Sequence, residues 1–573
     1  MPNIDEINCD VLVIGSGAGG LSAAVTAGKA GLKVVVVEKE PVYGGTTARS
    51  GGVLWVPGNP VNKREGIKDT AAAARRYLQH EAGNFFDAAR VDAFLANAPQ
   101  MVEFFESQTS VKFQSNAAFP DYHPHAPGAM PGGRSIVAAA IQGQELGDNI
   151  KQLRPPLKEI TFVGMAFNAS KEVQHFFKAT TSLTSFVYVV KRLASHSLEM
   201  LRYGRAMRLT NGNALVARLA KSAFDLSIPI HVSSPATALI KEGDAVLGAM
   251  VNLKGRMTKV LARRGVVLAA GGFPQDVERR KELFPHAPTG AEHYSPAPPG
   301  NTGDGLRLAR SVGGCTEDGL PNAAAWIPVS RVPYRNGSVG HFPHLIDRYK
   351  PGIIAVLKNG RRFTNEADSY HDFGRAMVEA NAGQPEVAAW LVCDHKTLRK
   401  YGMGFVKPFP LPLAHHLASG YLLRGRTIVE LAHRAGIDAI QLQHTIDQFN
   451  THAKKGQDPQ FGKGSTVYNR FLGDAEHKPN PCLGPLEKGP FYAIKVLPGD
   501  LGTFAGLRTN HNAQVLDQND QPITGLYASG NDMASIMGGN YPGGGITLGP
   551  AMTFGYIAAR HMAGLPIDYV PSE

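Results

Sequence analysis

The stretch that most constrains the fold runs from Val11 to Glu40 and reads VLVIGSGAGGLSAAVTAGKAGLKVVVVEKE. The apolar run Val11–Ile14 predicts a buried strand, and the small residues of Leu21–Ala30 predict a helix. A second apolar run follows and ends in an acidic residue, which predicts a second strand. A strand, a glycine-rich turn, a helix and another strand predict a βαβ unit in a parallel sheet.

Three glycines between that strand and that helix have the spacing G-x-G-x-x-G: Gly15, Gly17 and Gly20. The first permits a tight turn, the second lets the backbone approach a pyrophosphate, and the third lets helix and strand pack closely. Glu38 ends the second strand, 18 residues after Gly20. A carboxylate there accepts hydrogen bonds from a ribose and repels a 2′-phosphate. The unit therefore predicts a dinucleotide site that disfavours NADP, with phosphate at the helix N-terminus.

The segment after the acid indicates which dinucleotide binds. Pro41–Gly52 reads PVYGGTTARSGG, a second run rich in glycine and hydroxyl groups. NAD folds do not need such a run, whereas it suits a longer, two-headed cofactor. We therefore expect FAD. An apolar strand ending in AAGG, Gly265–Gly272, is suited to bringing more backbone close to that cofactor.

The chain length indicates more than one small core. With 573 residues and 43% hydrophobic content, two domains or one large cofactor domain with an insertion are expected. Between about Asn322 and Val496 the βα rhythm is lost and prolines, histidines and aromatic residues increase. We predict an α/β fold: a Rossmann-like FAD-binding domain from 1–328 and 497–573, with a helical excursion around 150–208, and an inserted α+β catalytic domain at 329–496.

Cysteine usage and hydropathy argue for a cytoplasmic chain. Four cysteines lie far apart without a C-x-x-C pair, so neither a metal cluster nor a disulfide framework is predicted. The acidic N-terminus does not resemble a signal peptide, and no apolar run is long enough to span a bilayer.

The net charge of +11 raises the question of whether the protein binds nucleic acid. Basic clusters such as Arg263-Arg264 and Lys454-Lys455 are short, and neither an aromatic ladder nor a basic helix accompanies them. We therefore expect no nucleic-acid partner. A weak attraction to an anionic membrane surface stays open.

Local patterns also predict helices and a loop. Asp69–Gln79 and Asp92–Gln108 have helical spacing, with Asp69 and Asp92 as expected caps. The loop Phe119–Gly128, FPDYHPHAPG, is rich in proline and suits either a site wall or a rigid surface turn. No third histidine stands at ligand spacing from His123 and His125, so no metal site is assigned.

Several motifs together resemble the flavoproteins of the fumarate reductase/succinate dehydrogenase superfamily: GSGAGG with Glu38, GGTTARSGG, VVLAAGG, NTGDG at Asn301–Gly305 and GLYASGN at Gly525–Asn531. The closer similarity is to the 3-ketosteroid Δ1-dehydrogenases. It rests on NYPGGGITLGPAMTFGY at Asn540–Tyr556, GRRFTNEADSY at Gly360–Tyr370 and the loop FPDYHPHAPG. The resemblance implies an FAD enzyme that introduces a double bond beside a ring ketone.

The resemblance also implies roles for individual residues. Tyr541 and the backbone N–H of Gly545 match the family's carbonyl-binding pair, which stabilises charge developing on the ketone oxygen. Tyr370 matches the proton acceptor and Tyr122 the phenol that hydrogen-bonds it. Because a free phenol has a pKa of about 10, the base needs such a partner. A hydride from the β-carbon then passes to flavin N5.

The cofactor is expected to be noncovalent, because no histidine precedes Gly44 in the manner of covalent flavoproteins. The residues that we expect to bind the cofactor are Gly15, Ser16, Gly17, Ala18, Gly19, Gly20, Glu38, Lys39, Gly45, Thr46, Thr47, Ser50, Gly51, Gly52, Ala236, Ala270, Gly271, Gly303, Asp304, Gly530, Asn531, Gly545, Thr547 and Leu548.

Two positions depart from the family pattern, since Ser369 and Gly544 stand where prolines are common. The resemblance leads us to expect a 3-ketosteroid or a smaller cyclic ketone such as cyclohexanone as the substrate, and an external carrier such as a quinone as the electron acceptor. Residues expected in the substrate wall are Phe113, Phe119, Leu411 and Tyr421. Two alternatives stay open: a dicarboxylate reductase, which is disfavoured because Met533–Gly549 lacks histidine and arginine, and a non-catalytic electron-relay flavoprotein.

Overall fold

A computed structural model describes residues 5–167, 175–176 and 182–568 of the chain. Its largest sheet has the strand order β20-β21-β10-β11-β1-β2-β8, with β9 paired to β10. The strands of this sheet are β1 Asp5–Ile14, β2 Val34–Val37, β8 Ile230–His231, β9 Ala236–Glu242, β10 Ala245–Leu253, β11 Arg256–Leu268, β20 Gln514–Leu516 and β21 Pro522–Ala528.

The centre of this sheet is parallel and its strand ends coincide. Ile14 at the end of β1 lies opposite both Val37 of β2 and Leu268 of β11, and Leu268 lies opposite Ala528 of β21. Four strands drawn from both ends of the chain therefore finish at one edge. Glycine follows three of them, β1, β11 and β21, within three residues, which leaves room for a ligand beyond the parallel strands.

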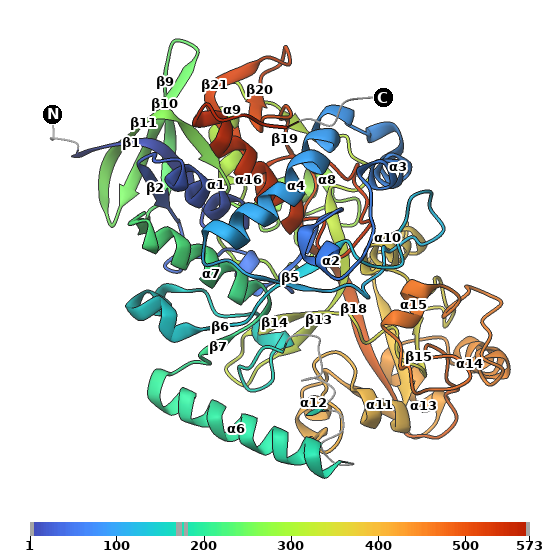
Figure 1. The fold of residues 1–573 in the computed structure, drawn as a ribbon. Helices are drawn as coiled ribbons and strands as arrows, with labels where there is room; N and C mark the ends of the chain where they lie inside the picture. Colours follow the sequence, from blue (N-terminus) through green and yellow to red (C-terminus); the bar gives the residue numbers. More distant parts are fainter. Residues whose placement is uncertain (1–4, 168–174, 177–181, 569–573) are drawn as a thin grey trace.

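Helices cover this sheet, so its central strands are buried on both faces. The helix α1, Ala18–Lys29, lies against α16, Leu548–Met562, and α16 lies against α4, Ala88–Gln108 (Figure 1). A Cβ on Gly555 of α16 would stand 2.4 Å from the carbonyl oxygen of Gly19, so the two helices touch backbone to backbone. The last helix of the chain is thus built onto the first.

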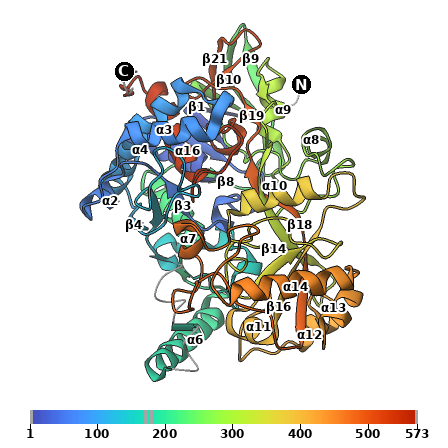
Figure 2. The same cartoon turned by 90° about the vertical axis from the view of Figure 1, so that its right-hand side faces the viewer.

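A second, antiparallel sheet has the order β14-β13-β18-β16-β15, with β17 also paired to β18. Its strands are β13 Ala324–Pro333, β14 Val339–Pro343, β15 Ile353–Val356, β16 Ala389–Asp394, β17 Leu423–Gly425 and β18 Phe491–Thr503. The helix α10, Tyr370–Ala380, packs on β13 and lies between the largest sheet and the lower part of the molecule (Figure 2).

The predicted α/β class is confirmed, and both sheets are present. The boundaries drawn at 328 and 497 fall inside β13 and β18, so these two strands join the regions on either side of them. The division into domains stays a prediction.

The smaller elements surround these sheets. They are α2 Pro60–Arg64, α3 Ala71–Ala82, α7 Asn211–Asp225, α8 Val277–Leu283, α9 Asp304–Arg310, α11 His395–Tyr401, α12 Ala414–Ala418, α13 Ile428–Ala435, α14 Ala439–Ala453, α15 Val467–Phe471, β3 Val53–Trp55, β4 Phe113–Ser115, β5 Ser135–Ala138, β6 Ile141–Gln142, β7 Arg208–Leu209, β12 Thr316–Glu317 and β19 Gly506–Leu507.

The expected helix caps were wrong. Thr70 caps α3 by accepting from Ala73 N at 3.1 Å, and Asp87 caps α4 by accepting from Arg90 N at 3.1 Å. Asp69 instead binds the buried Arg134. Asp92 binds Arg75 at 2.7 Å. Both carboxylates are thus used by arginines outside the local pattern.

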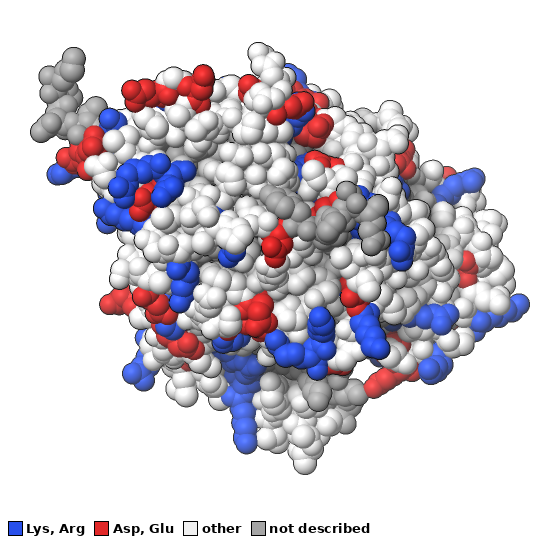
Figure 3. Space-filling view, turned by 45° about the horizontal axis from the view of Figure 1, so that its top comes forward, with Lys and Arg blue, Asp and Glu red and all other residues white. Residues whose placement is uncertain are grey.

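The helix α6, Leu183–Tyr203, lies at the lower edge of Figure 1. Several of its apolar side chains are exposed, among them Leu183 at 78% and Leu201 at 85% of their full area. No helix among the described residues is long and apolar enough to cross a membrane. On the face drawn in Figure 3, basic and acidic side chains are interspersed, so positive charge is not gathered into one patch there.

Candidate cofactor site and active site

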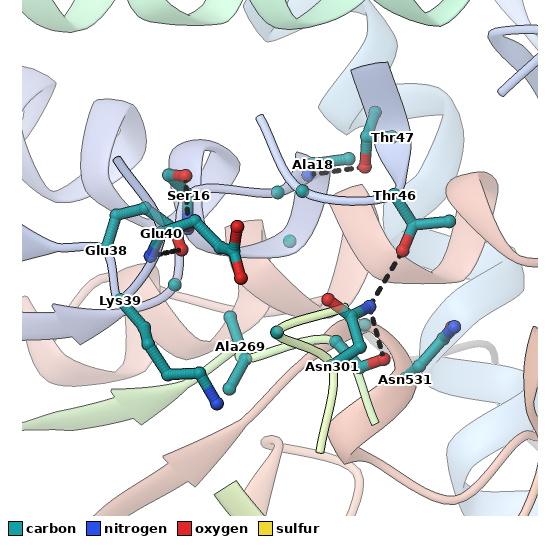
Figure 4. Close-up of a pocket in the computed structure, with 18 of the residues that line it drawn as sticks. Ser16, Ala18, Glu38, Lys39, Glu40, Thr46, Thr47, Ala269, Asn301 and Asn531 are labelled. Carbon is teal, nitrogen blue, oxygen red and sulfur yellow. Dashed lines mark hydrogen bonds between the residues drawn. The ribbon is translucent and has the colours of Figure 1, made fainter. Parts of the chain in front are cut away.

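A cavity lies at the carboxyl edge of the parallel strands (Figure 4). Of the predicted cofactor residues, those that line it are Gly15, Ser16, Gly17, Ala18, Gly19, Glu38, Lys39, Gly45, Thr46, Thr47, Ser50, Ala236, Ala270, Gly271, Asp304, Gly530, Asn531, Thr547 and Leu548. They come from segments between residues 15 and 548. The turns after β1, β2, β11 and β21 therefore meet around one elongated space.

The three glycines of the first turn differ in the room around them. Gly15 has φ +110°, and a Cβ there would stand 2.1 Å from Ala269 O. A Cβ on Gly20 would stand 2.1 Å from Gly15 O, whereas one on Gly17 would meet nothing closer than Thr47 Oγ1 at 3.5 Å. The first and third glycines are needed for packing. The second leaves open space at the N-terminus of α1, where free N–H groups favour phosphate.

Glu38 stands directly after β2 and is 8% exposed. It accepts hydrogen bonds from Ser16 N at 3.2 Å and Glu40 N at 3.0 Å, and also from the Ser16 hydroxyl. Burial raises the pKa of Glu38, and these hydrogen bonds oppose the rise. The carboxylate is fixed at the place where a ribose hydroxyl is bound in dinucleotide folds.

Two side chains hold the turn after β11. Asp532 accepts from Ala270 N at 2.5 Å and from Gly272 N at 2.8 Å, and burial raises its pKa to about 6. Asn301 Nδ2 donates to Thr46 Oγ1 at 2.8 Å and to Gly271 O at 3.2 Å, which joins two walls of the cavity (Figure 4). The turn is thereby held without bulky side chains facing the cavity.

Five predicted cofactor residues do not line this cavity: Gly20, Gly51, Gly52, Gly303 and Gly545. Gly52 is required elsewhere, since a Cβ there would stand 2.3 Å from the carbonyl carbon of Asn211 at the start of α7. Lining residues that the sequence reasoning missed include Arg154, Ser234, Asn301 and Leu501. Asn301 belongs to the motif NTGDG and was within reach of that reasoning, whereas Arg154 and Leu501 carry no local signal.

Three tyrosines assigned to the reaction lie together, and we call Tyr122, Tyr370 and Tyr541 the phenol cluster. The hydroxyl of Tyr122 donates to that of Tyr370 at 3.0 Å. The rings of Tyr370 and Tyr541 meet edge to face with centroids 5.0 Å apart, and those of Tyr122 and Tyr541 are stacked at 5.7 Å. All three side chains are buried. Residues 419 positions apart in the chain thus form one group.

Backbone hydrogen bonds fix where these phenols stand. Tyr370 is the first residue of α10, whose cap Ser369 accepts from Asp372 N at 3.1 Å. Tyr122 N donates to Pro542 O at 2.9 Å, and the hydroxyl of Tyr77 donates to the same oxygen at 2.6 Å. The loop that carries Tyr122 is therefore tied directly to the loop that carries Tyr541.

Gly545 occupies a position open only to glycine. Its φ is +101°, and a Cβ there would stand 2.6 Å from the backbone of Leu54 and Trp55. Its carbonyl accepts from Trp55 N at 3.0 Å, while no described residue accepts a hydrogen bond from its N–H. Thr547, two residues on, lines the cofactor cavity. In the chain, this backbone donor therefore lies between Tyr541 of the phenol cluster and a residue that lines the cavity.

The two departures from the family pattern have local explanations. Ser369 supplies the cap of α10 through its hydroxyl. At Gly544, a Cβ would stand 2.5 Å from Cε1 of Phe119, so the glycine lets that ring approach the loop. Phe119 in turn lies beside Tyr122, with ring centroids 6.1 Å apart.

The other expected wall residues lie elsewhere. Tyr421 belongs to the core of the second sheet and its hydroxyl bonds that of Ser330 at 2.7 Å. Phe113 lies on β4, and Leu411 is joined through its carbonyl to Arg399. Of the four, Phe119 is the one that the structure brings into contact with the phenol cluster.

Burial dominates the ionisation of the phenols. It raises the pKa of Tyr370 and of Tyr122 well above 10, and the neighbouring phenols add to the rise at Tyr370. Burial also raises the pKa of Tyr541, against hydrogen bonds with Tyr370 and Thr547. An ionised base in this cluster therefore depends on hydrogen bonds that favour its anion.

His123, beside Tyr122, makes an ion pair that the sequence did not reveal. Its Nδ1 lies 2.6 Å from Glu81 Oε2 of α3, and its Nε2 lies 2.9 Å from Asp372 Oδ2 of α10. Burial alone would lower the pKa of His123, but the hydrogen bonds to Asp372 and Glu81 raise it to about 10. Across the described ranges, no group of three or more His, Cys, Asp or Glu is arranged to hold a metal.

Known proteins resemble this chain over nearly its whole length. A family profile described as FAD binding domain matches residues 10–548. The 4-oxocyclohex-2-ene-1-carboxylate 5-dehydrogenase of Sinomonas cyclohexanicum is 43% identical over 98% of this chain and 94% of its own. A 3-oxosteroid 1-dehydrogenase of Mycolicibacterium smegmatis is 36% identical over 97% of both chains.

A solved structure agrees with these relatives. The 3-ketosteroid delta1-dehydrogenase from Sterolibacterium denitrificans, crystallised with 1,4-androstadiene-3,17-dione, superposes with a TM-score of 0.90. It is 39% identical and the match covers 97% of this chain and 99% of that one.

Proposed function

Because the chain belongs to the FAD-binding family of flavoenzymes, we propose that it desaturates a cyclic ketone beside its carbonyl, using the phenol cluster. The observation that carries the proposal is the hydrogen bond of 3.0 Å from Tyr122 to Tyr370 beside Tyr541 and Gly545. Packing alone requires neither paired hydroxyl groups nor a free backbone donor next to the cofactor cavity.

The residues around the cavity fit FAD. Open space at Gly17, the carboxylate of Glu38 and the bare turn at Ala270-Gly271 suit a pyrophosphate, a ribose and a flat ring system. The chemistry that FAD supplies when bound is acceptance of a hydride from the carbon β to the ketone at its N5 atom.

The chain's own residues handle the carbonyl and the proton. The Tyr541 hydroxyl and the Gly545 N–H donate to the ketone oxygen, so they stabilise the negative charge that develops there as the α-proton leaves. Tyr370, as its phenolate, takes that proton. Tyr122 donates to Tyr370 and favours its anion before the proton arrives.

The substrate is a single-ring ketone or a 3-ketosteroid. The relative of highest identity among those given above acts on a single-ring keto acid, and the relatives at 36% and 39% identity act on steroids. A single-ring ketone is therefore the first substrate to test. For the electron acceptor we propose a quinone or another carrier, since the sequence carries one G-x-G-x-x-G turn and it belongs to the FAD site.

A weak association with an anionic membrane surface is supported by α6. Its exposed apolar residues and its basic residues, Lys191 and Arg202, suit the boundary between headgroups and acyl chains. Co-sedimentation with vesicles containing phosphatidylserine is expected for the wild type and reduced for Leu201→Glu. Equal sedimentation of the two proteins would exclude α6 as the contact.

The experiment that tests the reaction is anaerobic bleaching of the flavin. Holoenzyme is mixed in parallel with 4-oxocyclohexanecarboxylate, cyclohexanone, androstenedione and succinate. Bleaching by a cyclic ketone, with the unsaturated ketone as product, supports the proposal. Bleaching by succinate alone would favour a dicarboxylate enzyme, and no bleaching by any of the four would favour a non-catalytic relay protein.

A further inference from the structure

A second pair of tyrosines continues from the phenol cluster into the lower part of the molecule. The ring of Tyr468, on α15, lies 4.5 Å from the ring of Tyr122. The hydroxyl of Tyr468 lies 2.7 Å from that of Tyr349, which in turn donates to Asp368 O at 3.0 Å. Both side chains are fully buried.

We propose that Tyr468 and Tyr349 are positioning residues of the reaction, which direct hydrogen bonds through Tyr122 onto Tyr370 when Tyr370 is ionised. The inference rests on the proposed function, because it assumes that Tyr370 is the base.

The hydrogen bonds of this pair have two possible directions. Each phenol has one proton. While Tyr349 donates to Asp368 O, Tyr468 donates to Tyr349 and has no proton for Tyr122. If Tyr349 turns its proton to Tyr468, then Tyr468 can donate to Tyr122, and Tyr122 donates to Tyr370 as observed. Two rotated hydroxyls thus convert a neutral arrangement into one that points every donor at the phenolate.

Turning the Tyr349 hydroxyl toward Tyr468 does not leave the buried carbonyl of Asp368 without a hydrogen-bond donor. The carbonyl of Asp368 also accepts from Arg348 Nη1 at 3.3 Å, so it keeps a partner when Tyr349 turns away. An unpartnered buried carbonyl would otherwise oppose the change. The guanidinium of Arg348 lies 5.0 Å from the centroid of the Tyr349 ring and places positive charge at the far end of the pair.

The position of α15 is coupled to that of Tyr370. Asn469, next to Tyr468, donates to Ala367 O at 2.6 Å and to the Asp368 carboxylate at 3.1 Å. These residues immediately precede the cap of α10. Tyr468 is therefore held to the same segment that holds the base.

Charged groups surround the phenols as well as the pair Tyr468 and Tyr349. Burial raises the pKa of Tyr122, and its contacts with the hydroxyls of Tyr370 and Tyr468 oppose the rise. The titratable and charged groups beside the five phenols include Arg348 and Asp368 on one side and His123 with Asp372 on the other. His371 of α10 also lies there, with its ring centroid 6.2 Å from that of Tyr541. We therefore expect the hydrogen-bond donors directed at the Tyr370 phenolate to set its pKa.

The test is the dependence of kcat on pH between 6 and 10, with saturating cyclic ketone and an artificial quinone. We expect activity to rise with pH as Tyr370 ionises. Tyr468→Phe should move this rise to higher pH by about one unit, so that kcat below the midpoint falls about tenfold while KM is little changed. Tyr349→Phe should shift it in the same direction by less, because Tyr468 keeps its own proton.

The matched control is Tyr492→Phe. Tyr492 lies on β18, is as buried as Tyr468, and makes one hydroxyl contact, with His395 Nδ1 at 3.0 Å. Its loss should leave the pH profile unchanged. Flavin content and circular dichroism identify variants that fail to fold, and Tyr349→Phe carries the test if Tyr468→Phe is one of them.

The outcomes separate this inference from the proposed function. An inactive Tyr370→Phe with unshifted profiles for both pair variants overturns the role of the pair and leaves Tyr370 as the base. A fully active Tyr370→Phe overturns the proposed base and the pair with it. A shift in Tyr492→Phe as large as that in Tyr468→Phe also overturns the specific role of the pair.

Discussion

The cofactor cavity and the phenol cluster are built in different ways. The cavity is lined by turns that directly follow parallel strands, and at Gly15 and Gly20 the backbone itself leaves no room for a side chain. The phenol cluster is made by side chains from a loop, a helix start and a second loop, joined by hydroxyl contacts. The first is set by strand geometry near each glycine. The second depends on contacts between distant parts of the chain.

The difference predicts two kinds of mutational effect. A change in the cavity should affect folding and cofactor retention together, because the same backbone contacts serve both. A change at a phenol hydroxyl should leave the fold and the flavin in place and affect turnover.

The largest effect is expected from Gly15→Ala. The added Cβ would stand 2.1 Å from Ala269 O at φ +110°, which should cost roughly 3 kcal/mol or more through overlap and backbone strain. Little holoenzyme should be recovered, as measured by flavin absorbance of the purified protein. In the control Gly31→Ala, φ is +82° but no atom lies within 4 Å of the new Cβ, so strain alone should cost about 1–2 kcal/mol. Equal flavin retention in the two variants would contradict the packing role.

Next in size is Tyr370→Phe, which removes the hydroxyl bonded to Tyr122. Loss of the base should lower the rate of anaerobic flavin reduction by roughly 10²–10⁴-fold, with flavin content unchanged. A parallel loss of flavin would mean that the cluster and the cavity are not separable.

Tyr541→Phe should have a smaller effect. Removing one donor to the ketone oxygen while the Gly545 N–H remains should lower kcat by roughly 10²-fold. Rapid-mixing measurement of flavin reduction isolates this step. Reduction at the wild-type rate would show that the oxygen is held by other groups.

The smallest effect is expected on stability, at His123. Its pKa in the folded chain is about 10, above the usual value of about 6.5, so its contribution is complete below pH 6.5 and is lost as pH rises toward 10. The thermal midpoint of the wild type should fall across this range, and that of His123→Gln should start lower and fall less. Parallel curves for the two proteins would remove His123 as the cause.

How much the sequence could predict follows the same division. Glycine spacing and Glu38 located the cavity because strand, turn and acid are neighbours in the chain. The prediction of Asp69 and Asp92 as helix caps was wrong. A local pattern cannot show that these carboxylates form ion pairs with Arg134 and Arg75. The three tyrosines that we assign to the reaction came from a family resemblance. Tyr349 and Tyr468 lack such a motif, and their contact joins residues 119 positions apart.

The pairing of β21 with β11 has a consequence for how the protein is made. A ribosome has released about nine-tenths of the chain before Pro522–Ala528 can join the sheet, and α16 follows later still. Until then the cavity lacks the wall that contains Gly530, Asn531 and Thr547. We therefore expect cofactor capture to follow the addition of β21 to the sheet, and a C-terminally truncated chain to be released without flavin.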